Sequence, residues 1–156
     1  MEARMTQPAI LFPDAMKAMH ALHGTVEKSG LPASTIRLVE VRASQMNGCS
    51  VCVDMHAREM KQDGESDERL FTVAAWRDAP YFTDAERAAL ALTEELTVLD
   101  RTGVSDEVWN EARRYYDERE LAGLVIAIAN INVWNRLNIP TRQVAGEWIK
   151  RQAAAR

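Results

Sequence analysis

Cys49 and Cys52 are the two cysteines of the chain, and they lie three residues apart in NGCSVCVDMH, with His56 four residues after Cys52. On a helix that turns by about 100° per residue, all three side chains share one face. Positions three apart in a helix are close enough for a disulfide, so this bond can form and break with little backbone movement. The spacing predicts a redox-active cysteine pair beside an imidazole.

The predicted place of the pair at a helix start favours nucleophilic chemistry. Free amides and the helix dipole stabilise a thiolate there, and a neutral His56 can accept the proton of Cys52. Attack of the thiolate on a peroxide oxygen gives a sulfenic acid, which a second thiol converts to a disulfide with release of water. We therefore expect Cys52, Cys49 and His56 to be catalytic, in a site that solvent can reach.

Two alternatives use the same residues. A thiolate also attacks disulfides, so the pair is compatible with a protein or small-molecule disulfide reductase. C-x2-C plus a histidine also supplies three zinc ligands, with His20 or His23 as a fourth, in a non-enzymatic zinc-binding or structural module. Zinc sites of this type usually hold their cysteines on a turn, and 156 residues bury a sufficient core without metal. We predict no metal and no cofactor, and we expect His20 and His23 at the surface or a subunit interface.

The elements that must position these residues are helices. Strict two-residue alternation of apolar and polar residues is nearly absent, whereas spacings of three and four recur, which predicts an all-α fold. One helix is expected from about 33 to 46 and the next from about 49 to 62, with the CxxC motif at its N-terminus. Asn47-Gly48 separates them, because glycine tolerates the left-handed conformation that ends helices.

Polar residues with capping chemistry precede several later helices. A short polar side chain accepts from the free amides of the first turn, and a glutamate three residues later reaches back. The predicted capping boxes are Thr83 with Glu86 and Asp117 with Glu120, and the predicted single caps are Ser66 and Ser105. With a last helix in the tail from 146 to 156, seven or eight helices form one compact domain over residues 1–156.

Composition excludes several classes of protein. The chain is 47% hydrophobic and 27% charged, with a net charge of −4 and no basic block, so no nucleic-acid partner is expected. Its most apolar stretch, 121–134, is shorter than the roughly 20 residues of a bilayer crossing, which predicts a buried helix and no membrane partner. No secretory signal is recognised at the N-terminus, so we expect a cytoplasmic protein.

The chain resembles the AhpD-like alkylhydroperoxidases of the carboxymuconolactone decarboxylase superfamily. The resemblance rests on LVEVRASQMNGCSVCVDMHAREM, AAWRDAPYFTDAERAALALTEELT and INVWNRLN. It implies an all-helical fold that assembles as a trimer or hexamer. It also implies reduction of a hydroperoxide, with an external thiol or dithiol as reductant. By this resemblance Cys52 is the peroxidatic thiol, deprotonated through His56, and Cys49 resolves it.

The sequence departs from the family pattern at two positions. In the founding members, a glutamate twelve residues before the first cysteine and a histidine just before the second complete a proton relay, whereas this chain has Arg37 and Val51 there. Two carboxylates are candidate replacements: Glu40, on roughly the same helical face as Arg37, and Glu86, from another helix. Without such a role, Glu40 is expected to be solvated and Glu86 to act in its capping box. Arg37 either favours the thiolate by its charge or pairs with a surface acid.

Overall fold

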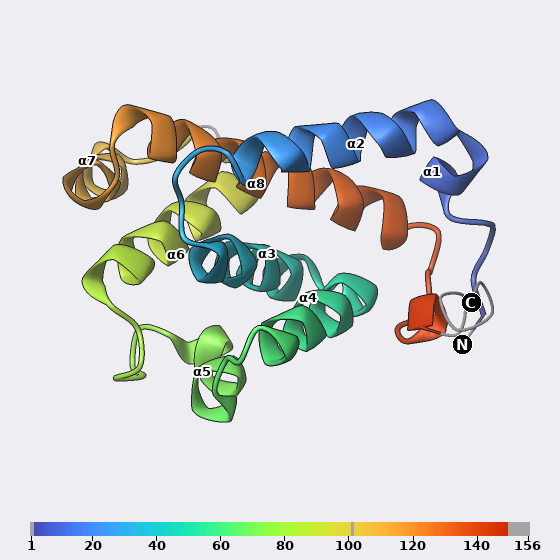
Figure 1. Cartoon of the computed structure of the whole chain (residues 1–156), viewed down its shortest axis with the longest axis horizontal. Coiled ribbons are helices and arrows are strands. Elements are labelled where there is room, and N and C mark those ends of the chain that lie inside the picture. The colour runs from blue at the N-terminus through green and yellow to red at the C-terminus, as the bar shows by residue number, and fades with distance from the viewer. Residues whose placement is uncertain (1, 101, 150–156) are drawn as a thin grey trace.

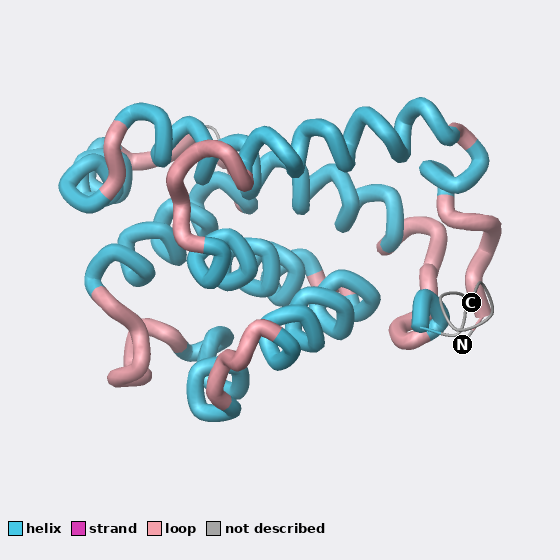
Figure 2. The backbone as a smooth tube through the Cα atoms, in the orientation of Figure 1, coloured by secondary structure: helices cyan, strands magenta, loops and turns pink. Residues whose placement is uncertain are grey.

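A computed structural model describes residues 2–100 and 102–149, and within these ranges every regular element is helical (Figures 1 and 2). The all-α prediction is confirmed. The elements are α1 (Pro8–Leu11), α2 (Pro13–Val26), α3 (Ala33–Asn47), α4 (Ser50–Gln62), α5 (Asp67–Thr72), the 3-10 turn η1 (Val73–Ala75), α6 (Asp84–Thr97), α7 (Asp106–Tyr115) and α8 (Glu118–Asn138).

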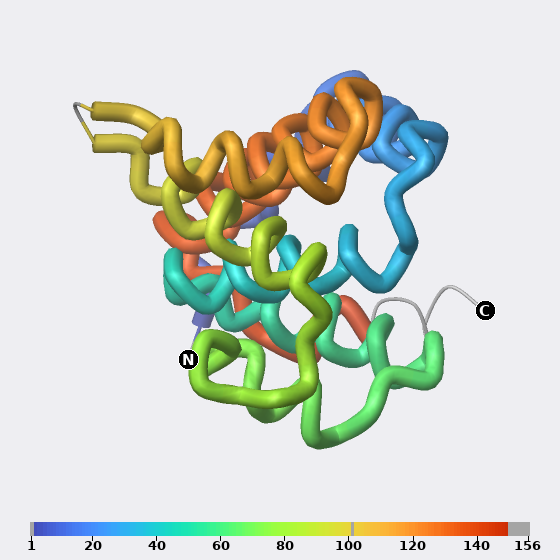
Figure 3. The backbone as a smooth tube through the Cα atoms, turned by 90° about the vertical axis from the view of Figure 1, so that its left-hand side faces the viewer, coloured from blue at the N-terminus to red at the C-terminus, as the bar shows by residue number. Residues whose placement is uncertain are grey.

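The central helix is α3, which packs against α4, α6 and α8, while α2 lies along α8 (Figure 1). Figure 3 shows α6 passing between α7 on one side and α3 and α4 on the other. One apolar cluster joins α2, α3, α6 and α8, and a second fills the space between α3, α4, η1 and α6. Because α3 is surrounded, its polar side chains must find partners inside the protein.

The predicted caps are confirmed. Thr83 and Asp117 each form a complete capping box, with Glu86 and Glu120 respectively. Ser66 and Ser105 each accept a hydrogen bond from the backbone amide three residues later. These local bonds start the helices at the positions that the sequence specifies.

The turn between α3 and α4 delivers the cysteine pair. Gly48 ends α3 in the left-handed conformation, with φ of 73°, as the Asn47-Gly48 break predicts. The backbone N–H of Cys49 then donates to the carbonyl of Ser44 at 2.9 Å. Cys49 is the N-cap of α4, so Cys52 lies in the first turn of that helix. The CxxC motif therefore begins a helix, as expected.

Some boundaries differ from the predictions. The short helix α1 was not predicted, and it begins at a proline whose fixed φ suits the first helical position. The predicted last helix, 146–156, lies mostly outside the described residues. No helix in the described part of the chain is both long and apolar enough to cross a membrane.

Candidate functional site

The cysteine pair is joined. Cys49 and Cys52 form a disulfide with their Cα atoms 5.4 Å apart. Cys49 is 2% exposed and Cys52 is 0% exposed. Both sulfurs pack with Ala43 and Ile131, and Trp134 flanks them. The expectation of a site open to solvent is therefore wrong for this oxidised state, because side chains of α3 and α8 cover the bond.

His56 lies one turn after Cys52 on α4 and is buried with it. Its Nδ1 atom is 2.9 Å from Glu59 Oε2 and 3.4 Å from Glu40 Oε2. Both carboxylates therefore engage Nδ1 rather than Nε2. Imidazole held by carboxylates through one nitrogen is the usual arrangement for a general base.

Glu40 is the buried centre of this cluster. Its carboxylate contacts His56, His23 Nδ1 at 3.3 Å and Arg37 Nη1 at 3.2 Å. Burial alone would raise the pKa of Glu40, but the hydrogen bond with His23 and the charges of His56 and Arg37 hold it below its usual value. The structure thus brings Glu40 to His56, and its predicted solvated alternative is wrong.

Arg37 balances the negative charge of the cluster. Its Nη1 atom lies 3.2 Å from Glu40 and 3.3 Å from Glu59, and its Nε atom lies 4.0 Å from Asp63. Burial opposes a charged guanidinium, yet the charges of Glu40 and Glu59 raise the pKa of Arg37. Of its two expected roles, pairing with acids is the one that the structure shows, and Glu40 among these acids is buried rather than at the surface.

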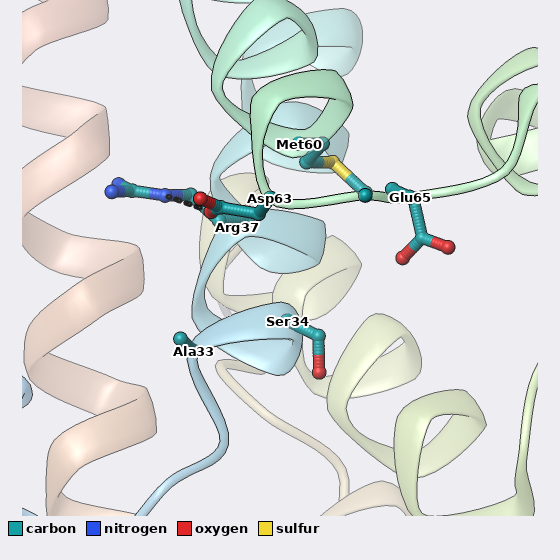
Figure 4. A pocket seen from close by; sticks show the side chains of 7 residues that line it. Ala33, Ser34, Arg37, Met60, Asp63 and Glu65 are labelled. Carbon is teal, nitrogen blue, oxygen red and sulfur yellow. Dashed lines mark ion pairs between the residues drawn. The ribbon is translucent and has the colours of Figure 1, made fainter.

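Arg37 also forms one wall of a cavity of about 350 Å³ (Figure 4). The lining residues come from the start of α3 and the end of α4: Ala33, Ser34, Arg37, Met60, Asp63, Gly64 and Glu65. In Figure 4, Arg37 lies beside Asp63, and Glu65 lies apart from both. The guanidinium of Arg37 thus lies between the carboxylate cluster and this cavity.

Residues 13–95 match the model of the carboxymuconolactone decarboxylase family. The chain belongs to this family. YdfG, an uncharacterized protein of Bacillus subtilis, is 36% identical over 127 residues, which are 81% of this chain and 86% of YdfG. YnjA, an uncharacterized protein of Escherichia coli, is 32% identical over 117 residues, covering 74% of this chain and 64% of YnjA.

Solved structures share the AhpD-like fold of this family member. A candidate AhpD antioxidant-defence protein of unknown function from Agrobacterium tumefaciens has a TM-score of 0.86 at 35% identity, covering 92% of this chain and 98% of its own. The debrominase Bmp8 in complex with 2,3,4-tribromopyrrole has a TM-score of 0.75 at 20% identity, covering 84% of this chain and 70% of its own. At that identity the likeness shows the fold alone.

Glu86, the other candidate carboxylate, is placed elsewhere. Its Oε1 atom lies 2.5 Å from Arg69 Nη2, and Oε2 accepts from the backbone N–H of Thr83 at 2.9 Å. These contacts occupy both carboxylate oxygens in a capping box and an ion pair. Within this family member, Glu40 and not Glu86 is the predicted carboxylate that reaches His56.

Glu59 and Asn138 were not predicted for the site, and His23 was considered there only as a fourth zinc ligand. Glu59 follows His56 by three residues, so helical spacing could have indicated it. His23 reaches Glu40 from α2, and Asn138 Nδ2 donates to Cys52 Sγ at 3.4 Å from the end of α8. No local spacing connects these two to the motif, because they are brought to it by tertiary packing.

The histidines considered as zinc ligands have other partners. His23 pairs with Glu40, and the ring of His20 lies 5.7 Å from that of Trp134. Over residues 2–100 and 102–149, no group of three or more His, Cys, Asp or Glu side chains is arranged to hold a metal ion. The zinc alternative thus finds no ligand set in the part of the chain that is described.

Proposed function

We propose that this chain is a thiol-dependent peroxidase that reduces hydroperoxides through a Cys49–Cys52 dithiol–disulfide cycle, with an external thiol or dithiol as reductant. The observation that carries the proposal is the disulfide itself, formed one turn before a buried histidine whose Nδ1 is held by two carboxylates. The names of the AhpD-like relatives support the same class of chemistry.

The oxidative half of the cycle begins with the reduced pair. Nε2 of His56 accepts the proton of the Cys52 thiol, and the thiolate attacks the terminal oxygen of the hydroperoxide. The O–O bond breaks, Cys52 becomes a sulfenic acid, and the alkoxide takes the proton from His56 and leaves as an alcohol. The Cys49 thiol then attacks the sulfenic sulfur, so that the disulfide forms and water leaves.

The reductive half restores the dithiol. A thiolate of the external dithiol attacks the disulfide and forms a mixed disulfide, which its second thiol resolves. The donor becomes a disulfide, and two protons pass to the cysteines. Because both sulfurs are buried when joined, this attack requires local opening of the cover that Ile131 and Trp134 provide. We place the first attack at Cys49, the sulfur that lies before the helix.

Glu40 and Glu59 stabilise the imidazolium that forms when His56 takes the proton of Cys52. Arg37 offsets the second carboxylate charge, so the cluster stays close to neutral in a buried setting. This arrangement replaces the family relay that is missing at positions 37 and 51. We also propose that the chain assembles as a homo-oligomer, a trimer or hexamer, as its family resemblance implies.

Free-thiol titration tests the proposal. Reduced protein should lose two thiols after one equivalent of cumene hydroperoxide, and it should turn over with dithiothreitol as donor. Cys52→Ser should abolish oxidation, whereas Cys49→Ser should react once and leave a sulfenic acid that dimedone traps. Unchanged turnover by Cys52→Ser would contradict the assignment. Faster turnover on small disulfides than on hydroperoxides would favour the disulfide reductase instead.

A further inference from the structure

Buried asparagines of α8 bind the segment that carries the cysteine pair. They belong to INVWNRLN and are three residues apart: Asn132, Asn135 and Asn138. We call them the asparagine ladder. Asn47 Nδ2 donates to Asn132 Oδ1 at 2.9 Å and to Asn135 Oδ1 at 2.8 Å. Asn135 Nδ2 donates in turn to Ser44 Oγ at 3.1 Å. The first two asparagines therefore fix the end of α3, directly before Gly48 and Cys49.

The last asparagine of the ladder reaches a sulfur. Asn138 Nδ2 donates to Cys52 Sγ at 3.4 Å, and both residues are buried. Asn138 is the final residue of α8, and its carbonyl accepts from Thr141 Oγ1 at 3.2 Å and from the backbone N–H of Gln143 at 3.1 Å. These bonds fix the backbone from which the amide donates.

We propose that Asn138 is a further catalytic residue, whose amide stabilises the thiolate of Cys52 and so makes Cys52, rather than Cys49, the nucleophile. This inference rests on the proposed function. A disulfide sulfur is a weak acceptor, whereas a thiolate is a charged one, and hydrogen bonds to charged groups are about twice as strong as neutral bonds. In the disulfide form Cys52 has no exposed surface, so its sulfur contacts the Asn138 amide rather than bulk water.

In the reduced protein, Cys49 and His56 are the titratable groups that lie beside Cys52. His56 shares the α4 face of Cys52, and Glu40, Glu59 and Arg37 lie behind its imidazole. These charged groups affect the stability of the Cys52 thiolate only indirectly, through their contacts with His56. Asn138 is neutral and contacts the sulfur directly, so its contribution can be separated by substitution with His56 left intact.

The test measures each thiol by itself in reduced protein. In a Cys49→Ser background only Cys52 remains, and thiolate absorbance is followed against pH. Asn138→Leu should move the midpoint to higher pH and lower the thiolate fraction at pH 7 at least about tenfold, since a hydrogen bond to a charged group is stronger than one to a neutral group. The rate at which iodoacetamide alkylates Cys52 at pH 7 should fall by the same factor as the thiolate fraction. In a Cys52→Ser background, the same substitution should leave the titration of Cys49 unchanged.

Asn130→Leu is the matched control, because Asn130 is another buried asparagine of α8 and makes no hydrogen bond to either sulfur. Should Asn138→Leu fail to fold, Asn138→Asp keeps the shape, removes the donor and should shift the midpoint further. An unmoved Cys52 midpoint in a folded variant, or equal shifts for both cysteines, would overturn the proposal. A shifted midpoint without peroxide turnover in the wild type would support Asn138 and overturn the peroxidase function alone.

Discussion

Glu40 Oε1 lies 3.3 Å from Nδ1 of His23, which joins the buried carboxylate of α3 to a partly exposed histidine of α2. The other oxygen of Glu40 faces His56, so one carboxylate bridges two imidazoles. The hydrogen bond with Glu40 raises the pKa of His23, and the charge of Glu40 adds to this, although burial opposes it. The contact thus couples α2 to the candidate active site and makes that coupling depend on pH.

Because the pKa of His23 is raised in the folded protein, its protonated form stabilises the fold. This contribution is complete below about 6.5, the ordinary pKa of histidine, and is lost as the pH rises through the raised value. His23→Ala should therefore lower the free energy of unfolding by on the order of 1 kcal/mol more at pH 6 than at pH 9. Urea denaturation at the two pH values measures the difference. An equal loss for His23→Ala at both pH values would refute the coupling.

Substitution of Glu40 should lower activity, whereas substitution of Glu86 should lower stability. Glu40→Gln removes the buried counter-ion of His56, and we expect kcat for peroxide reduction to fall about 100-fold, the size of a general acid–base contribution. Glu86→Gln breaks the ion pair with Arg69 and weakens the Thr83 capping box, so it should cost about 1–2 kcal/mol of stability. The kcat of Glu86→Gln should stay within about twofold of the wild-type value. Thermal melts and steady-state assays on both variants check this, and the reverse pattern would exchange their roles.

Replacement by alanine of two glycines that lie in helices should change the stability of the protein in opposite directions. A Cβ at Gly123 would lie 2.5 Å from the side chain of Ser29 and 3.1 Å from Leu31. Ser29 Oγ is held by its bond to the carbonyl of Val26 at 2.6 Å, so Gly123→Ala should cost about 1–3 kcal/mol. A Cβ at Gly24 meets nothing within 4 Å, so Gly24→Ala should stabilise α2 by about 0.5–1 kcal/mol. A Gly123→Ala variant that is as stable as the wild type in urea denaturation would show that the close approach of α8 to Ser29 is wrong.

Local chemistry made the helices and the motif predictable. Capping boxes, the Asn47-Gly48 break and the spacing from Cys49 to His56 each depend on a few neighbouring residues, and the structure follows them. The same reasoning made Glu40 a candidate, because Glu40 lies on the helix that precedes the motif.

Contacts between distant helices were not predictable from spacing. His23 and Asn138 reach the site only because α8 packs against α3 and α2 lies along α8. The burial of the disulfide has the same origin, since Ile131 and Trp134 of α8 cover it. Sequence periodicity shows that a helix has an apolar face but not which residues of another helix that face covers.

The position of Cys49 as the N-cap of α4 gives the two sulfurs unequal freedom. Cys52 is anchored within the first turn, whereas Cys49 has extended backbone angles, φ −83° and ψ 90°, and joins the helical ladder only through its carbonyl, which accepts from the backbone N–H of Val53 at 2.9 Å. Once the bond between them is reduced, the side chain of Cys49 can rotate about its own torsions while every helical hydrogen bond of α4 stays in place. Each round of oxidation and reduction can then proceed by rotation of the Cys49 side chain, without unwinding the helical turn that positions Cys52.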